Sequence, residues 1–315
     1  MLEKMMTKGK NVLITGGTGL VGHALCNMLA EKGYSVTILT RSTNNTTNNS
    51  AVDYAHWDIN NKYIDPVALS KADYIIHLAG AGVVDKKWTV AYKKEIQDSR
   101  IKSSKLIIHS LQNNPHKVKA IISASAIGWY GPDVKENYQF VETDVADGHF
   151  LGETCKLWEE SIEPATKLGI RVCKIRTGIV LSTKGGALVE FMKPIRLGIA
   201  GILGNGKQMV SWIHIDDLCR IFIHAIENEN LNGSYNAVAP APVSNKMLTI
   251  TLAKIMKGIF FIPSYVPKFV LKIMMGERSI EVLKSTNVSC EKIRNTGFTF
   301  LFPSIEMALK NLLKK

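Results

Sequence analysis

The chain has 315 residues, 46% of them apolar, which suits one large domain with an appendage. No apolar stretch reaches the roughly 18 residues of a membrane span, and the charged start, MLEKMMTKGK, lacks the apolar run of a secretory signal, so we expect a short leader there. The net charge of +12 suggests nucleic acid or a membrane surface as a partner, but the lysines are spread out and no basic run of five occurs. We therefore expect a solvated lysine-rich surface and neither partner.

The cysteines predict neither a metal site nor disulfides. They are scattered and include no CxxC pair, which argues against zinc or a redox dithiol. An odd number of cysteines without a pattern fits a reducing compartment. We expect a cytoplasmic protein without a bound metal.

Strand and helix patterns alternate along the first half of the chain. Short apolar runs typical of strands fall at 11–15, 35–40, 73–78, 119–123 and 170–176. Apolar residues at helical spacing fall between them, at 19–32, 89–112 and 153–167. An Asn/Thr-rich loop is expected at 44–50. Repeated strand–helix–strand units predict an α/β fold with a doubly wound parallel sheet.

The rhythm changes from about residue 177. The segment 185–206 is rich in glycine and predicts loops around a short helix. Helical patterns follow at 216–227, 244–257 and 266–275. We expect these segments to build a smaller C-terminal part that acts as a substrate or lid domain.

The most specific motif is the run TGGTGLVG that starts at Thr15. Gly16, Gly19 and Gly22 form a GxxGxxG series directly after a predicted strand and at the start of a predicted helix. A side chain at Gly16 would obstruct the turn, Gly19 lets backbone N–H groups approach a pyrophosphate, and Gly22 lets the helix pack on the strand. The helix N-terminus also favours negative charge. The predicted dinucleotide site comprises Gly16, Thr18, Gly19, Leu20, Val21 and Gly22.

The end of the second predicted strand indicates which dinucleotide binds. NAD sites usually place Asp or Glu there, to bond the ribose 2′-hydroxyl. Here the residues are Thr40, Arg41 and Ser42, and none is acidic. Because a guanidinium pairs bidentately with a phosphate, Arg41 favours NADP (NADPH) over NAD. The alternative is that Arg41 is a solvated loop cation.

The usual catalytic pair of a short-chain dehydrogenase is absent. That pair is a tyrosine and a lysine four residues later, and the ammonium lowers the pKa of the phenol. None of the nine tyrosines has a lysine four residues later. By register against the segment Trp158-Glu159-Glu160, Phe150 occupies the tyrosine position and Thr154 the lysine position.

Several motifs together resemble one group of proteins. They are TGGTGLVG, HLAGAGV, KKWT, DSR, SASAIGWYG, CKLWEE, IRTGIVL and GNGKQMVSWIHIDD, with the tail from residue 263 onward. They resemble the atypical extended short-chain dehydrogenase/reductase (SDR) group called the epimerase family, which is NAD-dependent epimerase/dehydratase-like and has a C-terminal domain of unknown function. The resemblance covers about residues 11–312 and implies an NADP-binding Rossmann fold.

The resemblance also implies site residues and a division into domains. Family members contact NADP through positions that match Thr40, Arg41, Leu78, Ala79, Glu95, Arg100 and Val180, and we include the adjacent Gly80. It implies that Phe150 is a family trait. We expect a Rossmann domain at 11–176 completed by segments of 207–240, a mixed substrate-side region at 177–262, and a C-terminal helical domain at 263–312.

Other groups must replace the missing pair if the protein is an enzyme. Our candidates are Ser125, at the end of a predicted strand, and Tyr130, although Tyr130 could instead cap the pocket. Four further titratable residues lie nearby, namely Glu142, His149, Glu153 and Cys155. Cysteine in such a place is more often a buried small hydrophobe. Downstream, Asp216 suits a helix N-cap as well as a substrate ligand.

Two functions follow from these patterns. The first is an NADP-dependent oxidoreductase or epimerase that acts on a small, nucleotide-sugar-like substrate, with Ser125 and Tyr130 orienting the reacting oxygen. The second is a non-catalytic NADP-binding regulator, which the missing Tyr/Lys pair favours. A homodimer is left open.

Overall fold

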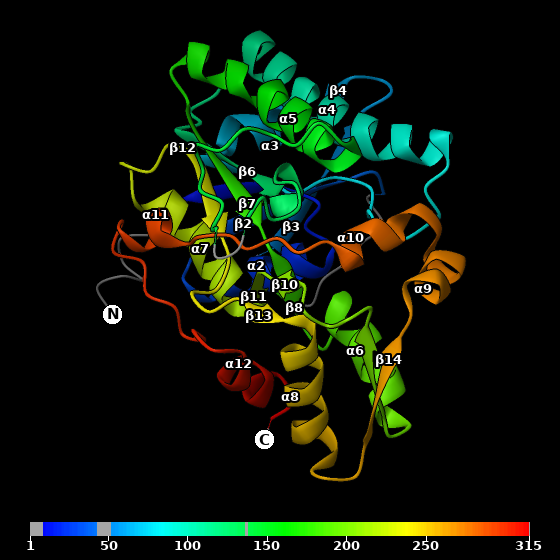
Figure 1. Cartoon of the computed structure of the whole chain (residues 1–315). Helices are drawn as coiled ribbons and strands as arrows, with labels where there is room; N and C mark the ends of the chain where they lie inside the picture. The colour runs from blue at the N-terminus through cyan, green and yellow to red at the C-terminus, as the bar shows by residue number, and fades with distance from the viewer. Residues whose placement is uncertain (1–8, 43–51, 136–137, 315) are drawn as a thin grey trace.

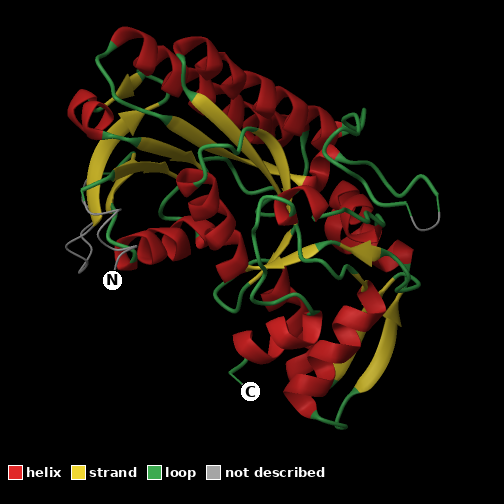
Figure 2. Ribbon diagram, turned by 90° about the vertical axis from the view of Figure 1, so that its left-hand side faces the viewer, coloured by secondary structure: helices red, strands yellow, loops and turns green. Residues whose placement is uncertain are grey.

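The computed structural model describes residues 9–42, 52–135 and 138–314. Its centre is an eight-stranded sheet (Figures 1 and 2) in the order β12-β7-β6-β5-β1-β2-β3-β4. The strands are β1 (Asn11–Thr15), β2 (Ser35–Thr40), β3 (Val52–Asp58), β4 (Tyr63–Ile64), β5 (Tyr74–His77), β6 (Ala120–Ala126), β7 (Arg171–Thr177) and β12 (Gly233–Ala237). Every neighbouring pair is parallel except β3 with β4. This confirms the predicted doubly wound sheet.

Helices cover both faces of the sheet. One face carries α3 (Pro66–Lys71), α4 (Val90–Asn113), α5 (Phe150–Ile162) and the 3₁₀ helix η2 (Glu163–Leu168). The other face carries α2 (Leu20–Glu31) and α7 (Ile215–Glu227). Strand side chains alternate between these layers, so Leu13 packs into the first core and Ile14 into the second. Because helices cover both faces, most residues of the central strands are buried, whichever face they point to.

The strand order reverses beside β1. The chain moves from β1 to β2 and β3 on one side, and then crosses to β5, β6 and β7 on the other. The crossover helices therefore diverge at the carboxyl ends of β1 and β5. In open α/β sheets, ligands bind in the crevice at this point.

A smaller part extends from the carboxyl side of the sheet. Its helices are α6 (Ala187–Arg196), α8 (Asn245–Lys257), α9 (Lys268–Met275), η3 (Gly276–Arg278), α10 (Ser279–Leu283) and α12 (Ile305–Leu312). Its strands are β8 (Ile179–Leu181), β9 (Ile199–Leu203), β10 (Met209–Val210), β11 (Trp212–His214), β13 (Val243–Ser244) and β14 (Ile262–Val266). The short helix α11 (Glu291–Arg294) instead packs beside β12 of the central sheet. A third core joins α6, α8 and α12. No described helix is long and apolar enough to span a bilayer.

The structure corrects several local expectations. The glycine-rich segment 185–206 contains strand β9 as well as a helix, because β14 pairs with it in parallel. For the same reason the helix expected at 266–275 begins only at Lys268. Strands β3 and β4 and helix α3 were not predicted, although Asp65 before Pro66 is a recognisable helix start. The loop expected at 44–50 lies outside the described residues, and the domain boundaries stay predictions.

Candidate functional site

The turn between β1 and α2 is shaped by three glycines with two different roles. Gly16 adopts φ +70°, and a Cβ atom there would lie 2.9 Å from the carbonyl carbon of Leu78. A Cβ atom at Gly22 would lie 2.2 Å from the carbonyl oxygen of Gly16. At Gly19, the single neighbour of a Cβ atom would be that same oxygen at 3.3 Å. Gly16 and Gly22 thus permit close backbone packing, whereas Gly19 keeps the space before the helix clear.

The start of α2 fits the phosphates of a dinucleotide. Gly19 is the N-cap residue, and among the described residues no side chain caps the helix. The first-turn N–H groups, which include those of Leu20 and Val21, have no helical acceptors. Together with the helix dipole they attract negative charge. This cradle, which added Cβ atoms would fill, is suited to a pyrophosphate.

Thr15 joins the end of β1 to the loop that follows β5. Its Oγ1 accepts hydrogen bonds from the backbone N–H groups of Leu78 and Ala79, both at 3.2 Å. It also lies 2.7 Å from Nδ1 of the fully buried His77, whose Nε2 lies 3.1 Å from Oγ of Ser104. Burial lowers the pKa of His77 to about 3, so the ring stays neutral. His77 therefore has the structural role expected of a histidine inside a strand.

Arg100 lies behind the loop that follows β5. Its Nη1 donates to the carbonyl oxygens of Ala81 and Ile96, both at 2.9 Å, and its guanidinium lies 5.0 Å from the Trp158 ring centroid. Burial lowers its pKa. A Cβ atom at Gly80 would lie 3.0 Å from its Cζ. Arg100 is thus packed under the predicted cofactor loop.

The remaining predicted cofactor residues lie on separate elements. Glu95 is exposed on α4 and pairs with Lys86 at 3.4 Å, unlike the packed Arg100. Thr40 ends β2 and accepts a hydrogen bond from the N–H of Ser42 at 3.2 Å, and Arg41 after it is exposed. Val180 is half-buried on β8. Their contacts with a cofactor stay predictions.

A buried polar network occupies the carboxyl ends of β6 and β7. Ser125 is only 3% exposed, and its Oγ donates to Oε1 of Glu159 on α5 at 2.7 Å. Arg176 on β7 forks onto the same carboxylate, with Nε at 2.8 Å and Nη2 at 3.0 Å. Its Nη1 donates to the Tyr130 hydroxyl at 3.0 Å, and that hydroxyl donates to Oδ1 of Asn236 at 2.7 Å. The two predicted hydroxyls are therefore joined through one buried ion pair.

Tyr130 is poorly placed for proton transfer. Its side chain is 0% exposed, and its ring stacks on Phe140 with centroids 5.0 Å apart. Burial raises the pKa of the phenol to about 12, although the Arg176 guanidinium partly opposes the rise. The ordinary SDR tyrosine needs the opposite shift. Burial likewise raises the pKa of Cys155 to about 12, which fits the small hydrophobe we favoured.

The positions of the missing pair are filled by apolar and short polar side chains. Phe150 makes an edge contact with Trp88, their ring centroids 5.0 Å apart. The ammonium of Lys93 lies 5.2 Å from the Phe150 ring centroid and also pairs with Glu277 of η3. Thr154 donates to the carbonyl oxygen of Phe150 at 2.6 Å. The tyrosine position is thus taken by a phenylalanine ring with a cation near it.

The other candidates have structural partners. Oε1 of Glu142 accepts from the Asn236 N–H at 2.8 Å. His149 is exposed beside Asp147, whose carboxylate raises the pKa of the imidazole. The N-cap of α7 is His214, not Asp216. Within the described ranges, no group of three His, Cys, Asp or Glu side chains could hold a metal.

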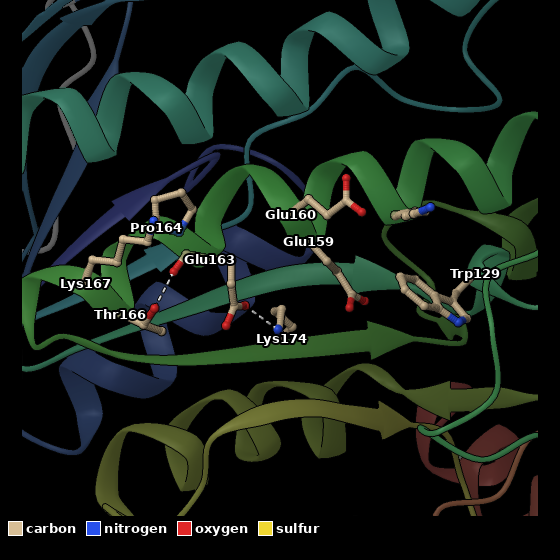
Figure 3. A pocket seen from close by; sticks show the side chains of 9 residues that line it. Trp129, Glu159, Glu160, Glu163, Pro164, Thr166, Lys167 and Lys174 are labelled. Atoms are coloured by element: carbon tan, nitrogen blue, oxygen red, sulfur yellow. Dashed lines mark hydrogen bonds and ion pairs between the residues drawn. The ribbon is translucent and has the colours of Figure 1, made fainter.

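A groove of about 450 Å³ brings solvent close to the network. It runs along α5 and η2, and Figure 3 shows Glu159 and Trp129 on its walls. Lys174 and Glu163 form an ion pair of 2.6 Å further along it. The Arg176 guanidinium lies 3.6 Å from the Trp129 ring centroid. The indole of Trp129 therefore separates the buried cation from this groove.

Two family models match this chain. Residues 12–238 match the NAD dependent epimerase/dehydratase family, and residues 266–312 match a domain of unknown function, DUF1731. The chain belongs to the NAD-dependent epimerase/dehydratase family. This confirms the resemblance inferred from the motifs.

Several relatives of this epimerase family are similar to nearly the whole of this chain. Epimerase family proteins of Staphylococcus saprophyticus and Staphylococcus epidermidis are both 35% identical, and the alignments cover 96% and 97% of this chain and 99% of each relative. The human epimerase family protein SDR39U1, crystallised with NADPH, superposes with a TM-score of 0.85 and 28% identity over 96% of this chain and 99% of its own. A nucleoside-diphosphate sugar epimerase from Corynebacterium glutamicum gives 0.76 and 30% identity, over 98% of this chain and 59% of its own.

The ion pair of Glu159 and Arg176 at the centre of the network was not predicted from the sequence. Glu159 and Arg176 were used only to set register and to end a strand, and Asn236 was not considered. One signal was available, because an arginine within the apolar strand sequence IRTGIVL needs a buried partner. Which acid supplies that partner depends on how α5 packs, and this is not visible in local spacing.

Proposed function

We propose that this protein is an NADP-dependent oxidoreductase or epimerase that acts on a small, nucleotide-sugar-like substrate. The observation that carries the proposal is the glycine cradle at the start of α2, which lies where the strand order reverses. The NADPH in the human relative and the sugar-nucleotide name of the bacterial one support the cofactor and substrate class. The bound nicotinamide would supply hydride transfer.

The chain's own residues would bind and orient. The first turn of α2 would hold the pyrophosphate and Arg41 would pair with the 2′-phosphate, while Arg100 supports the loop at Gly80. Ser125 and Tyr130 stay the predicted hydroxyls at the reacting end. To reach a substrate they must exchange bonds to Glu159 or Asn236, which favours positioning over proton transfer. A homodimer and a cytoplasmic location stay predictions.

A specific observation favours the second candidate, a non-catalytic NADP-binding regulator. Phe150 and Thr154 replace the proton-transfer pair, and the hydroxyls of Ser125 and Tyr130 are already bonded within the protein. Both candidates require NADP binding. They differ in whether a substrate ever oxidises the bound NADPH, which a screen of sugar nucleotides and carbonyl compounds measures directly.

Cofactor choice tests the shared part of both candidates. NADPH should bind at least about tenfold more tightly than NADH, which corresponds to about 1.4 kcal/mol. Arg41→Ala should remove most of that difference in a calorimetric titration, because the 2′-phosphate loses its guanidinium. The matched control is Arg196→Ala, an exposed arginine on α6, which should change neither affinity. Equal affinities of the unmodified protein for NADPH and NADH would contradict the proposal.

A further inference from the structure

Large apolar side chains are exposed together at one end of the smaller part. The turns after α6 and after α8 meet there, since the N–H of Ile262 donates to the carbonyl oxygen of Gly198 at 2.8 Å and Ile262 is paired with Ile199. Figure 1 shows these turns at one extremity of the molecule. We call the exposed residues Leu197, Ile199, Ile259, Phe260 and Ile262 the apolar tip.

Four of the five side chains of the tip are largely exposed. Leu197 is 82% exposed, Ile259 86%, Phe260 79% and Ile262 72%. Segments 187–203 and 245–275 together hold ten of the 22 large hydrophobic side chains that are exposed among the described residues. Contiguous exposed apolar residues usually mark a surface that binds something.

The same two segments are strongly basic. Together they contain seven lysines and arginines and a single acid, Glu190, which pairs with Lys193. Both α6 and α8 end at the tip with two basic residues in the last turn, Lys193 and Arg196 in one, Lys254 and Lys257 in the other. In the part of the chain that the structure describes, no acidic side chain forms an ion pair with Arg196, Lys254 or Lys257.

Helix stability alone does not explain this arrangement. Basic residues in the last turn of a helix interact favourably with the helix dipole. That accounts for the lysines but does not explain why the neighbouring Phe260 is exposed to water. An exposed apolar tip flanked by basic side chains has the composition of a surface that binds lipid interfaces. The basic residues looked dispersed in the sequence, and the fold gathers part of them here.

We propose that the apolar tip inserts into the interface of a bilayer that carries anionic lipid headgroups, with Arg196, Lys254 and Lys257 near those headgroups. A second copy of the chain is a poorer occupant. A two-fold interface sets the same patch of both copies face to face, so it would bring two basic clusters together. A lipid surface supplies apolar depth and negative charge together. This proposal departs from the expectation of no membrane partner and does not depend on the proposed function.

Vesicle sedimentation with the full chain tests the proposal. We expect binding to vesicles of phosphatidylcholine with about one third phosphatidylserine, little binding to phosphatidylcholine alone, and release when salt rises from about 0.1 M to about 1 M. Phe260→Ser should weaken binding at least about tenfold, because a large apolar side chain no longer leaves water. The matched control is Val145→Ser, which changes a side chain that is also 86% exposed but lies elsewhere.

A second pair of variants tests the charge. Reversing Lys254 and Lys257 to glutamate should remove the preference for phosphatidylserine, whereas Lys105→Glu, an exposed lysine on α4, should leave it intact. Thermal unfolding should confirm that every variant folds. Wild-type binding that is absent, equal on both vesicles, or insensitive to Phe260→Ser would overturn the proposal. So would sedimentation that shows a dimer which Phe260→Ser converts to monomer, without vesicle binding.

Discussion

The turn after β1 and the polar network at the ends of β6 and β7 are held together by different kinds of interaction. At the β1 end, close backbone packing at three glycines and neutral hydrogen bonds around Thr15 shape the turn. At the β6 end, Glu159 and Arg176 bury opposite charges among hydroxyls and an amide. Substitutions at the β1 end should therefore destabilise the protein by steric crowding, and substitutions at the β6 end by leaving a charge unpaired.

The largest effect on stability should come from a substitution at Gly22, in the first turn of α2. Gly22→Val places a Cβ atom 2.2 Å from the Gly16 carbonyl oxygen, so α2 must move off β1. We expect a loss of about 5 kcal/mol or more in the free energy of unfolding.

Gly19→Val separates stability from binding. Its Cβ atom meets the Gly16 carbonyl oxygen only at 3.3 Å, so the substitution should lower the free energy of unfolding by about 1 kcal/mol while abolishing NADPH binding. Urea unfolding and calorimetry measure both, and a Gly19→Val protein with normal NADPH affinity would place the phosphate site elsewhere.

At the other end, Glu159→Gln should have the next largest effect. The substitution keeps size and shape but leaves Arg176, whose side chain is 3% exposed, without its counter-charge. Breaking such a pair costs about 3 to 5 kcal/mol of unfolding free energy. The control Glu190→Gln breaks an exposed pair with Lys193 and should cost less than about 0.5 kcal/mol. Similar losses in the two variants would show that the buried network adds no stability.

The contrast also explains what could be predicted. Because backbone N–H groups can hold phosphates, glycine spacing within eight residues is enough to predict a site at Gly16, Gly19 and Gly22. The network joins Tyr130 to Asn236, 106 residues later, and no local pattern encodes such a contact. The same reasoning covers β9, whose glycine-rich sequence becomes a strand only because β14 pairs with it. The alternation in β3, where Val52, Ala55 and Trp57 are buried, is interrupted and easily missed.

The neutral character of the β1 end predicts a pH dependence. Burial holds the pKa of His77 at about 3 in the folded chain, below the ordinary value of about 6.5 in the unfolded chain. The unfolded state therefore binds more protons below pH 6.5, and stability is lost as the pH falls. Between pH 7.5 and pH 5 this histidine should remove about 2 kcal/mol. His77→Gln should flatten the urea-unfolding profile by that amount, and an unchanged profile would mean that His77 accepts a proton in the folded state.

The smallest expected change, Tyr130→Phe, decides what the hydroxyl at the β6 end does. The substitution keeps the ring stacked on Phe140 but leaves Oδ1 of Asn236 and Nη1 of Arg176 each short of a partner. If the hydroxyl positions the network, unfolding should become easier by about 1 to 2 kcal/mol, with NADPH affinity intact. Tyr138→Phe is the control, because its hydroxyl bonds to Asp144 near the surface and its loss should cost less.

If the hydroxyl instead takes part in the chemistry, a different pair of results is expected. Stability would change little, and oxidation of NADPH by a true substrate would fall by about two orders of magnitude, the lower end of what acid–base help contributes. The pKa of about 12 argues for the first outcome, because a buried phenol that holds its proton so firmly stabilises a network better than it exchanges protons. Unfolding and turnover measured on the same variant separate the two roles.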